Sequence, residues 1–352
     1  MEKEKTFIVK PPEKQKSPKQ YELSEMHDDL VLFPEEVRPL VEKHLEGQAL
    51  TLNEHGVLHR ARNAWWQEKY GFSYDNKIAR EEVLRRKYAS AKEMTEQENM
   101  QKRLFQAFRD NNAKEIASLK KYYEENYSDQ LEGIEILFGL NSFFETQKFL
   151  DTHKKDGWNE EVGQRVQSLT EYQFLLSDFV RHNARDKEFL SVFWEALERN
   201  AETSSHLKIM HQLRRSVLSG VALMKVFEAL GKKPFLSHPS EDAFRAIDMW
   251  IDAESAVQVK GAFSREDSLS IVDTDSIAFP AVEVKESGSS KLFNSHFSRH
   301  LQTFHAKIKN YEAVVGKKLR GYFVVIPYEK FDFVTGEPDE EIIQEVRHKL
   351  RA

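Results

Sequence analysis

Three polar side chains interrupt two short apolar segments near position 250. The stretch AIDMWIDAESAVQVKGAF, residues 246–263, places Asp248 in the first segment and Gln258 and Lys260 in the second. Carboxylate and amide oxygens are hard ligands that suit Mg²⁺ or Mn²⁺. A neighbouring lysine can stabilise the negative charge that develops on a phosphate during hydrolysis. These residue types therefore predict metal-dependent cleavage of a phosphodiester bond.

The spacing predicts an antiparallel hairpin that brings the three side chains together. Alternate residues of a strand share a face, so Asp248, Gln258 and Lys260 should point away from the apolar residues between them. A three-residue loop at 252–254 would place Gln258 opposite Asp248, whereas a four-residue loop would turn Gln258 away. The expected result is one apolar face toward the core and one polar face in a cleft open to solvent.

An acid on one strand followed by (Glu/Gln)-x-Lys on the next resembles the PD-(D/E)XK nuclease superfamily. The restriction-endonuclease-like fold of that family has a helix, a three-stranded meander, a second helix and a further strand. The sequence offers candidates for these elements in the same order, at 205–231, 234–238, 245–251, 256–263, 293–315 and 319–327. The resemblance covers the C-terminal part of the chain only.

The resemblance implies a role for each residue of the pattern. Asp248 would be a metal ligand, Gln258 would stand at the second acidic position and Lys260 would be the catalytic lysine. The family often adds an acid from the first helix, and Glu228 matches that position. The sequence departs from the pattern because no proline precedes Asp248 and because glutamine replaces the second acid, as in the Mrr-type branches. The insertion at 262–286 is a further departure.

The resemblance also implies a cofactor, Mg²⁺ (or Mn²⁺), and a nucleic-acid partner, with DNA expected. Two functions stay open. The chain is either a metal-dependent nuclease or a nuclease-fold scaffold that binds nucleic acid without cleaving it. Two carboxylates converging on Lys260 would favour the enzyme, and Asp248 alone would favour the binding protein.

A second copy of the same spacing lies downstream. Asp273, Glu283 and Lys285 repeat the intervals of the first pattern and include the acid that the first pattern lacks. Turn-forming residues around Asp273 and Pro280 weaken this alternative as a pair of strands.

Two other groups of residues could serve a function. His296 and His300 are spaced i, i+4 on an expected helix that also carries His305, a spacing that can bind a metal. A basic and aromatic cluster precedes position 70 and could clamp a nucleic-acid strand by stacking; it contains His59, Arg60, Arg62, Trp65 and Trp66. A solvated helix face for the histidines and a buried core for the tryptophans are the alternatives.

Composition and periodicity predict the elements that must position these residues. Residues 1–22 are rich in Lys, Glu and Pro and are expected to form a disordered tail. Apolar residues recur every three or four positions over 23–200, which predicts a helical domain. Residues 201–352 alternate short β-branched segments with helices, which predicts an α/β domain with a mixed sheet. The expected fold class is therefore α+β, with a boundary near residue 200.

Composition also limits the class of protein. The 352 residues contain no cysteine, which excludes disulfides, thiolate metal sites and a cysteine nucleophile. The charged N-terminus lacks the apolar core of a signal peptide and no stretch is long enough to span a membrane, so a cytoplasmic protein is expected. The net charge is −6, yet residues 205–330 hold 18 basic against 14 acidic side chains, which is compatible with a polyanion. The long charged helix expected at 78–109 could contact a protein partner or a second copy of the chain.

Overall fold

The computed structural model describes residues 18–71, 91–126, 132–153, 159–262, 269–276 and 295–351. Helices dominate up to residue 203: α1 (Pro18–Asp28), α2 (Arg38–Leu45), α3 (Leu52–Tyr70), α5 (Ala91–Arg109), α6 (Ala113–Asn126), α7 (Glu132–Thr152), α8 (Glu160–His182) and α9 (Lys187–Thr203), with the 3-10 helix η1 (Leu30–Leu32) after α1. Strands and helices then alternate: α10 (Leu207–Ala229), β1 (Phe235–Leu236), α11 (Pro239–Arg245), β2 (Met249–Trp250), β3 (Ser255–Ala262), β4 (Ser270–Asp273), η2 (Thr274–Ser276), α12 (Ser295–Val315), β5 (Arg320–Pro327), η3 (Tyr328–Lys330) and α13 (Glu340–Arg351).

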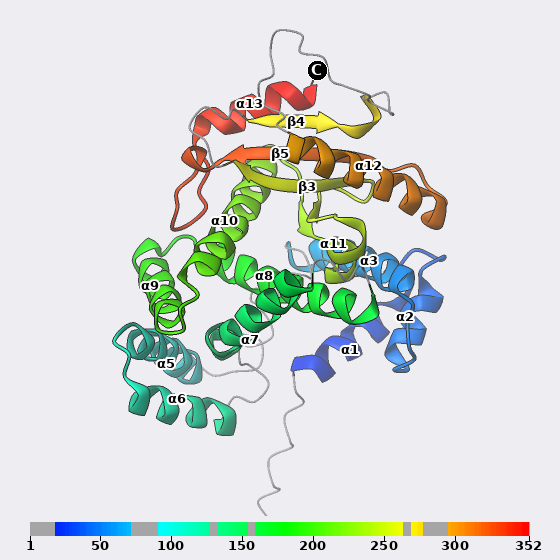
Figure 1. Ribbon diagram of the computed structural model, residues 1–352. Coiled ribbons are helices and arrows are strands. Elements are labelled where there is room, and N and C mark those ends of the chain that lie inside the picture. Colours follow the sequence, from blue (N-terminus) through cyan, green and yellow to red (C-terminus); the bar gives the residue numbers. More distant parts are fainter. Residues whose placement is uncertain are drawn as a thin grey trace, which may run out of the picture.

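The five strands form one mixed sheet in the order β1-β2-β3-β5-β4. Strands β1, β2 and β3 are a short antiparallel meander, whereas β5 runs parallel to β3 and antiparallel to β4. A parallel neighbour needs a crossover connection, and α12 lies in the segment that joins the two strands (Figure 1). The expectation of an α+β fold with a mixed sheet is confirmed.

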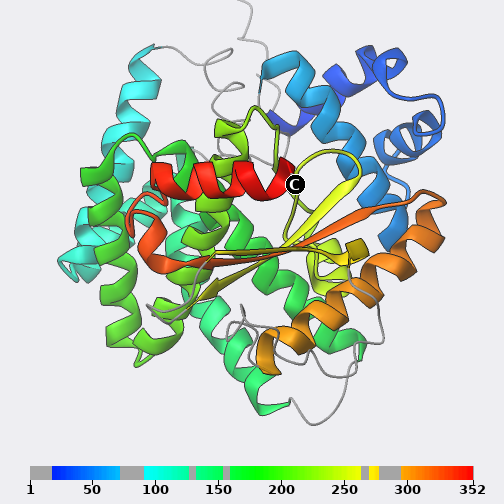
Figure 2. The same cartoon turned by 90° about the horizontal axis from the view of Figure 1, so that it is seen from above.

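Helices cover both faces of this sheet. Side chains from α10 and α13 share a buried cluster with Met249, Val257 and Val324 on one face. On the other face, residues of α12 pack against Trp250 and Phe323. Figure 2 shows the sheet nearly edge-on, with α13 on one side and α12 on the other. Strands buried on both faces read as near-continuous apolar runs, which is the pattern of β5.

The largest buried cluster is continuous across the expected boundary near residue 200. It contains Phe105 of α5, Phe179 of α8 and Leu197 of α9, together with Val324 and Ile326 of β5. A hydrophobic cluster shared in this way makes the two regions parts of one packed unit. That residues 201–352 form a separate domain therefore stays a prediction. The continuous core does not favour it.

Helices α1, α2 and α3 have a small core of their own. Trp65 and Trp66 are buried in it with Phe33 and Val41. The idea that these tryptophans stack on nucleic acid is therefore wrong, because their rings face protein. Helix α1 begins at Pro18, so residues 18–22 of the expected disordered tail are helical, while residues 1–17 lie outside the described part of the chain.

Capping side chains begin helix α3. The Thr51 hydroxyl accepts a hydrogen bond from the Glu54 backbone N–H at 3.3 Å, and the Glu54 carboxylate accepts one from the Thr51 N–H at 2.6 Å. This reciprocal arrangement satisfies two donors that a helix N-terminus leaves free. Helix α3 then lies against the α/β part of the molecule, where the His59 Nε2 atom is 3.1 Å from the Leu236 carbonyl oxygen.

Candidate active site

Of the two loop lengths that the spacing allows, the hairpin has the three-residue loop. Met249 pairs with Val257 and Trp250 with Ala256, and the Ile251 N–H donates to the Ser255 carbonyl at 2.9 Å. Strand β2 is only two residues long, so β3 loses this neighbour beyond Val257. The strands separate there, and the separation leaves room for side chains and solvent.

Asp248 lies at the point of separation. Its carboxylate oxygen Oδ2 accepts a hydrogen bond from the Val259 N–H at 2.6 Å, while its own N–H donates to the Val257 carbonyl at 2.9 Å. The side chain therefore takes the place that the backbone of a longer β2 would occupy. An unpaired buried N–H is costly, so this bond also stabilises the fold.

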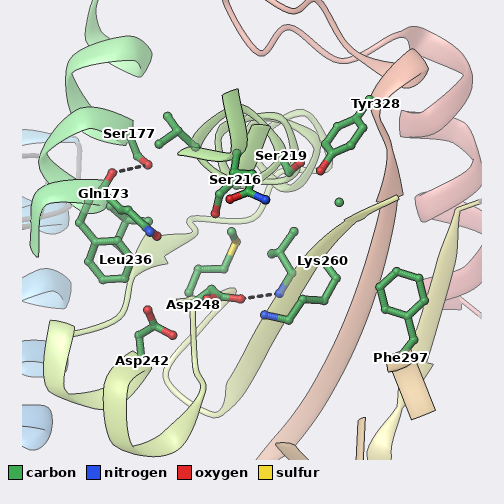
Figure 3. A pocket seen from close by; sticks show the side chains of 17 residues that line it. Gln173, Ser177, Ser216, Ser219, Leu236, Asp242, Asp248, Lys260, Phe297 and Tyr328 are labelled. Carbon is green, nitrogen blue, oxygen red and sulfur yellow. Dashed lines mark hydrogen bonds between the residues drawn. The ribbon is translucent and has the colours of Figure 1, made fainter. Parts of the chain in front are cut away.

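A cavity of about 630 Å³ opens between this end of the sheet and helices α8 and α10. Its sheet side presents Asp248 and Lys260, and Asp242 projects into it from α11 (Figure 3). The remaining lining residues are Gln173, Phe174, Ser177, Gln212, Ser216, Val217, Ser219, Gly220, Leu236, Met249, Val259, Gly261, Phe297 and Tyr328. Two carboxyls and a lysine thus converge on one cavity.

The sequence pattern does not identify Asp242, because no helix is expected between the strands at 234–238 and 245–251. They form α11, with Pro239 in the first turn, the His238 side chain accepting from the Ser240 N–H, and Glu241 completing a capping box. Proline near a helix start, followed by an acid, is the signal that could have found this helix. The Asp242 carboxyl accepts a hydrogen bond from the Thr170 hydroxyl of α8 at 2.9 Å.

Glu241 fixes the orientation of α11. Its carboxylate accepts hydrogen bonds from the Tyr311 hydroxyl at 2.7 Å, the Trp250 indole at 3.2 Å and the His238 N–H at 3.1 Å. These three donors come from α12, β2 and the residue that caps α11. A buried carboxylate with so many partners is held firmly, and Asp242, the next residue, is positioned with it.

Burial and mutual repulsion shape the charge of the two carboxyls. Loss of water raises the pKa of Asp242, the nearby Asp248 raises it further, and the positive charge of Lys260 opposes the rise. Burial also raises the pKa of Asp248, against Lys260 and the Val259 N–H, which lower it. The two carboxyls thus influence each other's ionisation, and the positive charge of Lys260 favours the ionised form of both.

Lys307 of α12 adds a second cation nearby. Burial lowers its pKa, the negative charge of Asp242 raises it, and the positive charges of Arg245 and Lys260 lower it. Its ammonium group therefore interacts with the same carboxyl as Lys260 does. Lys307 does not line the cavity, so it adds positive potential to the two acids and the one lysine that do.

Gln258 does not join this group. It is only 5 % exposed, it does not line the cavity, and its Oε1 atom has no hydrogen-bond partner among the described residues. The expectation that Gln258 faces solvent on a polar side of the hairpin is therefore wrong. The reason is α12, which covers the sheet face on which Ala256 and Gln258 lie.

Glu228 is also outside the site. It lies near the C-terminal end of α10 and forms an ion pair with Arg181 of α8. The part of α10 that lines the cavity ends at Gly220, which is about 12 Å away at 1.5 Å per helical residue. Glu228 therefore contributes to the packing of α8 on α10 and not to the cavity.

The other candidates do not assemble around this cavity. Asp273 is on β4, from which β5 separates β3 and Asp248, and Glu283 and Lys285 lie outside the described residues. His300 and His305 are on α12 but do not line the cavity, and the side chain of His296 lies outside the described part. In the described ranges, no group of three or more His, Asp or Glu side chains is arranged to hold a metal.

The carboxyl pair by itself fits a small hard cation. Hard oxygen ligands suit Mg²⁺, which commonly uses one or two carboxylates and completes its coordination with water and phosphate oxygens. Asp242 and Asp248 supply two carboxyls that repel each other unless a proton or a cation lies between them. Such a pair meets the minimum that Mg²⁺ requires of a protein.

Comparison with known proteins leaves the site to be interpreted from its own geometry. No family model, no curated protein sequence and no solved structure matches the chain. Among the helices in the described part of the chain, none combines the length and the apolar character that crossing a bilayer requires.

Proposed function

We propose that this cavity is the active site of a Mg²⁺-dependent nuclease that hydrolyses phosphodiester bonds in nucleic acid, with DNA as the expected substrate. One observation carries the proposal. Asp242 of α11, Asp248 directly before β2 and Lys260 of β3 converge on one cavity. Two carboxyls with a lysine are the groups that metal-assisted phosphodiester hydrolysis needs. Asp242 supplies the second acid that Gln258 does not.

The order of the elements supports a relationship to PD-(D/E)XK nucleases. A helix (α10), an antiparallel meander (β1, β2 and β3), a second helix (α12) and a strand parallel to the third (β5) follow one another. In that family the acid and the lysine lie on neighbouring strands; here Asp248 directly precedes β2, and Lys260 lies on the neighbouring β3. Helix α11 and strand β4 are additions to this plan. A fold alone does not establish an activity, so the proposal rests on the cavity residues.

The roles follow from position and charge. Asp242 and Asp248 would hold the metal ion, which when bound would polarise the phosphodiester. Lys260 would donate hydrogen bonds to the phosphate and stabilise the charge that builds up during attack. Lys307 would add positive potential from α12. Water adds across the P–O bond, so the products are a phosphomonoester and an alcohol. We place this activity in the cytoplasm, in line with a chain that has no cysteine.

The test measures metal binding and cleavage separately. Mn²⁺ should bind to the wild type with a stoichiometry of one, measured by electron paramagnetic resonance or calorimetry, and should support cleavage of single-stranded and plasmid DNA. Asp248→Ala and Asp242→Ala should lose Mn²⁺ binding. Lys260→Ala should retain Mn²⁺ and lose cleavage by about a hundredfold or more, because it removes transition-state stabilisation. Glu228→Gln is the matched control, since it changes an acid of α10 outside the cavity.

A binding protein without catalysis is the competing function. It is favoured by the absence of a third acid among the described residues near the pair. Wild type that takes up no Mn²⁺, or cleavage that persists equally in the Lys260→Ala and Asp248→Ala proteins, would remove the nuclease proposal. Retained nucleic-acid binding in that case would identify the scaffold.

A further inference from the structure

The wall of the cavity opposite Asp242 and Asp248 is uncharged. Helices α8 and α10 contribute eight lining residues, and none of the eight is charged. Gln173, Ser177, Gln212 and Ser216 are their main hydrogen-bonding side chains. None of the basic residues of these helices lines the cavity, although Arg215 of α10 lies over the ring of the lining residue Tyr328, 5.6 Å from its centroid. The α8–α10 lining itself therefore lacks the Arg and Lys side chains through which proteins mainly contact a phosphate backbone. It is suited to neutral groups with several donors and acceptors.

These side chains have hydrogen-bonding capacity to spare. In the described part of the chain, no residue forms a hydrogen bond with the side-chain amide of Gln173 or Gln212. The Ser177 hydroxyl donates to the Gln173 carbonyl and the Ser219 hydroxyl donates to the Arg215 carbonyl, both at 2.8 Å. Each hydroxyl oxygen can still accept a bond. Amides and hydroxyls of this kind read the edges of bases.

Aromatic rings lie on the same cavity. Phe174 comes from α8, Phe297 from α12 and Tyr328 from η3, and Tyr328 and Phe297 border the side of the cavity beyond Lys260 (Figure 3). Aromatic side chains provide surfaces on which a base can stack, with about 1–3 kcal/mol per stacked base. Charged groups at one side, neutral hydrogen-bonding groups opposite and aromatic rings at the edge of the cavity match the parts of a nucleotide.

The size of the cavity limits the substrate. A volume of about 630 Å³ corresponds to a sphere about 11 Å across. The major groove of B-DNA alone is about 12 Å wide, so an intact duplex does not fit between α8, α10 and the sheet. A single nucleotide unit does fit, because pockets of about 300–1,000 Å³ hold ligands of that size.

We propose that the cavity takes one unpaired nucleotide of a single-stranded nucleic acid, with the base on the α8–α10 wall and the phosphate at Asp242, Asp248 and Lys260. This inference rests on the proposed function for the position of the phosphate, and it adds the substrate class. It also gives the helical half of the chain a part in recognition, since α8 carries three of the lining residues, Gln173, Phe174 and Ser177.

Gly220 offers a direct test. It lines the cavity from α10, and a Cβ atom built there meets nothing within 4 Å. Gly220→Ala should be tolerated and should stabilise the helix, because alanine is the better helix former. Gly220→Leu should be tolerated in the same way but should fill the space where the base would lie. The two variants therefore differ in cavity volume and not in the acids.

The experiment measures binding by the Mn²⁺-loaded full chain. The probes are a short single-stranded DNA, a single-stranded RNA of the same sequence, a blunt duplex and a nucleoside 5′-monophosphate. At least one single strand should bind about tenfold or more tightly than the duplex, and Gly220→Leu should weaken that binding by about tenfold or more, whereas Gly220→Ala should leave it within about twofold. The DNA and RNA arms identify the sugar that the pocket accepts.

Equal binding of duplex and single strands would overturn the inference, and so would unchanged binding by a folded Gly220→Leu protein that takes up Mn²⁺ normally. Failure of the proposed nuclease function would give a different result from failure of this inference. The wild type would then fail to bind Mn²⁺ or fail to cleave, while the effect of Gly220→Leu on binding of the nucleoside monophosphate would still report on the pocket.

Discussion

Asp248 supplies both a structural contact and a chemical group. Its carboxylate accepts the Val259 N–H that β2 leaves without a partner, at 2.6 Å, and it faces the cavity beside Asp242 and Lys260. Substitution by alanine would remove both. Asparagine would keep an oxygen for the Val259 N–H, so Asp248→Asn is the better variant for separating stability from chemistry.

The raised pKa of Asp242 makes a prediction about stability. Burial, followed by the charge of Asp248, raises this pKa from 3.8 to about 8. The folded state therefore binds a proton more tightly than the unfolded state does. That contribution is fully present below pH 3.8 and is lost as the pH rises through about 8.

In the absence of metal, the free energy of unfolding of the wild type relative to Asp242→Asn should fall by up to about 1.4 kcal/mol per pH unit between pH 4 and pH 8. Denaturant titrations at several pH values measure the difference. Addition of Mn²⁺ at pH 8 should recover part of the loss in the wild type only, because the cation replaces the proton. Parallel pH curves for the two proteins would show that Asp242 ionises normally.

The sequence predicts part of this site because alternation along a strand is a local property. The antiparallel pairing of the segments that contain β2 and β3 follows from the pattern, and it places Asp248 beside β3, although the pattern leaves the loop length open. Asp242 depends on tertiary contacts instead, since Thr170, which binds Asp242, and Tyr311, which binds Glu241, are distant in the sequence. Gln258 fails as a site residue because nothing in the local pattern reveals that α12 covers its face of the sheet.

Strand β3 and the 3-10 helix η3 depend on a glycine for their close contact. A Cβ atom at Gly261 would overlap the ring of Tyr328, with the ring atom Cε1 only 2.5 Å away. Tyr328 borders the cavity together with Lys260, the residue before this glycine. The absence of a side chain at 261 is thus what permits the ring to close this end of the cavity.

Gly261→Ala should destabilise the protein by about 1–3 kcal/mol, the usual cost of forcing extra volume into a packed site. The companion change Tyr328→Ala removes the overlap, so adding Gly261→Ala to it should cost much less. Thermal unfolding of the wild type, both single variants and the double variant measures this coupling. Additive effects would mean that the two residues do not meet.

The elements themselves differ in how well the sequence predicts them. A long helix such as α10 has a strong three-and-four periodicity and begins two residues from its expected start at 205. Short elements are harder, because β1 and β2 are two residues each and depend on their neighbours in the sheet. Helix α11, seven residues long, has too few turns for periodicity to identify it.

At the scale of the whole molecule, the main core joins the helical half to the sheet. Leu197 of α9 and Ile326 of β5 are both fully buried in the same cluster. Leu197→Ala and Ile326→Ala should each cost about 2–5 kcal/mol. Both should lower the same single transition, measured by circular dichroism and tryptophan fluorescence. Two separate transitions, each sensitive to one variant, would instead support independent domains with a boundary near residue 200.

Helices α1–α3 are held to the rest of the molecule by contacts that contain three histidines. His238, which begins α11, stacks on His55 with ring centroids 5.3 Å apart and meets the edge of His59 at 5.3 Å. Burial, with the nearby charges of His59, His55 and Arg62, lowers the pKa of His238 from 6.5 to about 3. Arg62 and the two other histidines come from α3. Protonation of His238 would therefore weaken the contact between α3 and α11.

Acid should therefore release α1–α3 from α11. A histidine whose pKa is lowered in the docked state stabilises docking above pH 6.5, and this contribution is lost as the pH falls toward 3. The chain has no cysteine, so spin labels can be attached at Leu52→Cys on α3 and Val314→Cys on α12, which are 49 % and 48 % exposed. The distance between the labels should lengthen between pH 7 and pH 4.

His238→Asn is the control variant. Its side chain can still cap α11 but does not titrate, so the increase in label distance should occur at lower pH. A label distance that stays constant down to pH 4, or an identical pH profile in His238→Asn, would show that docking does not depend on His238.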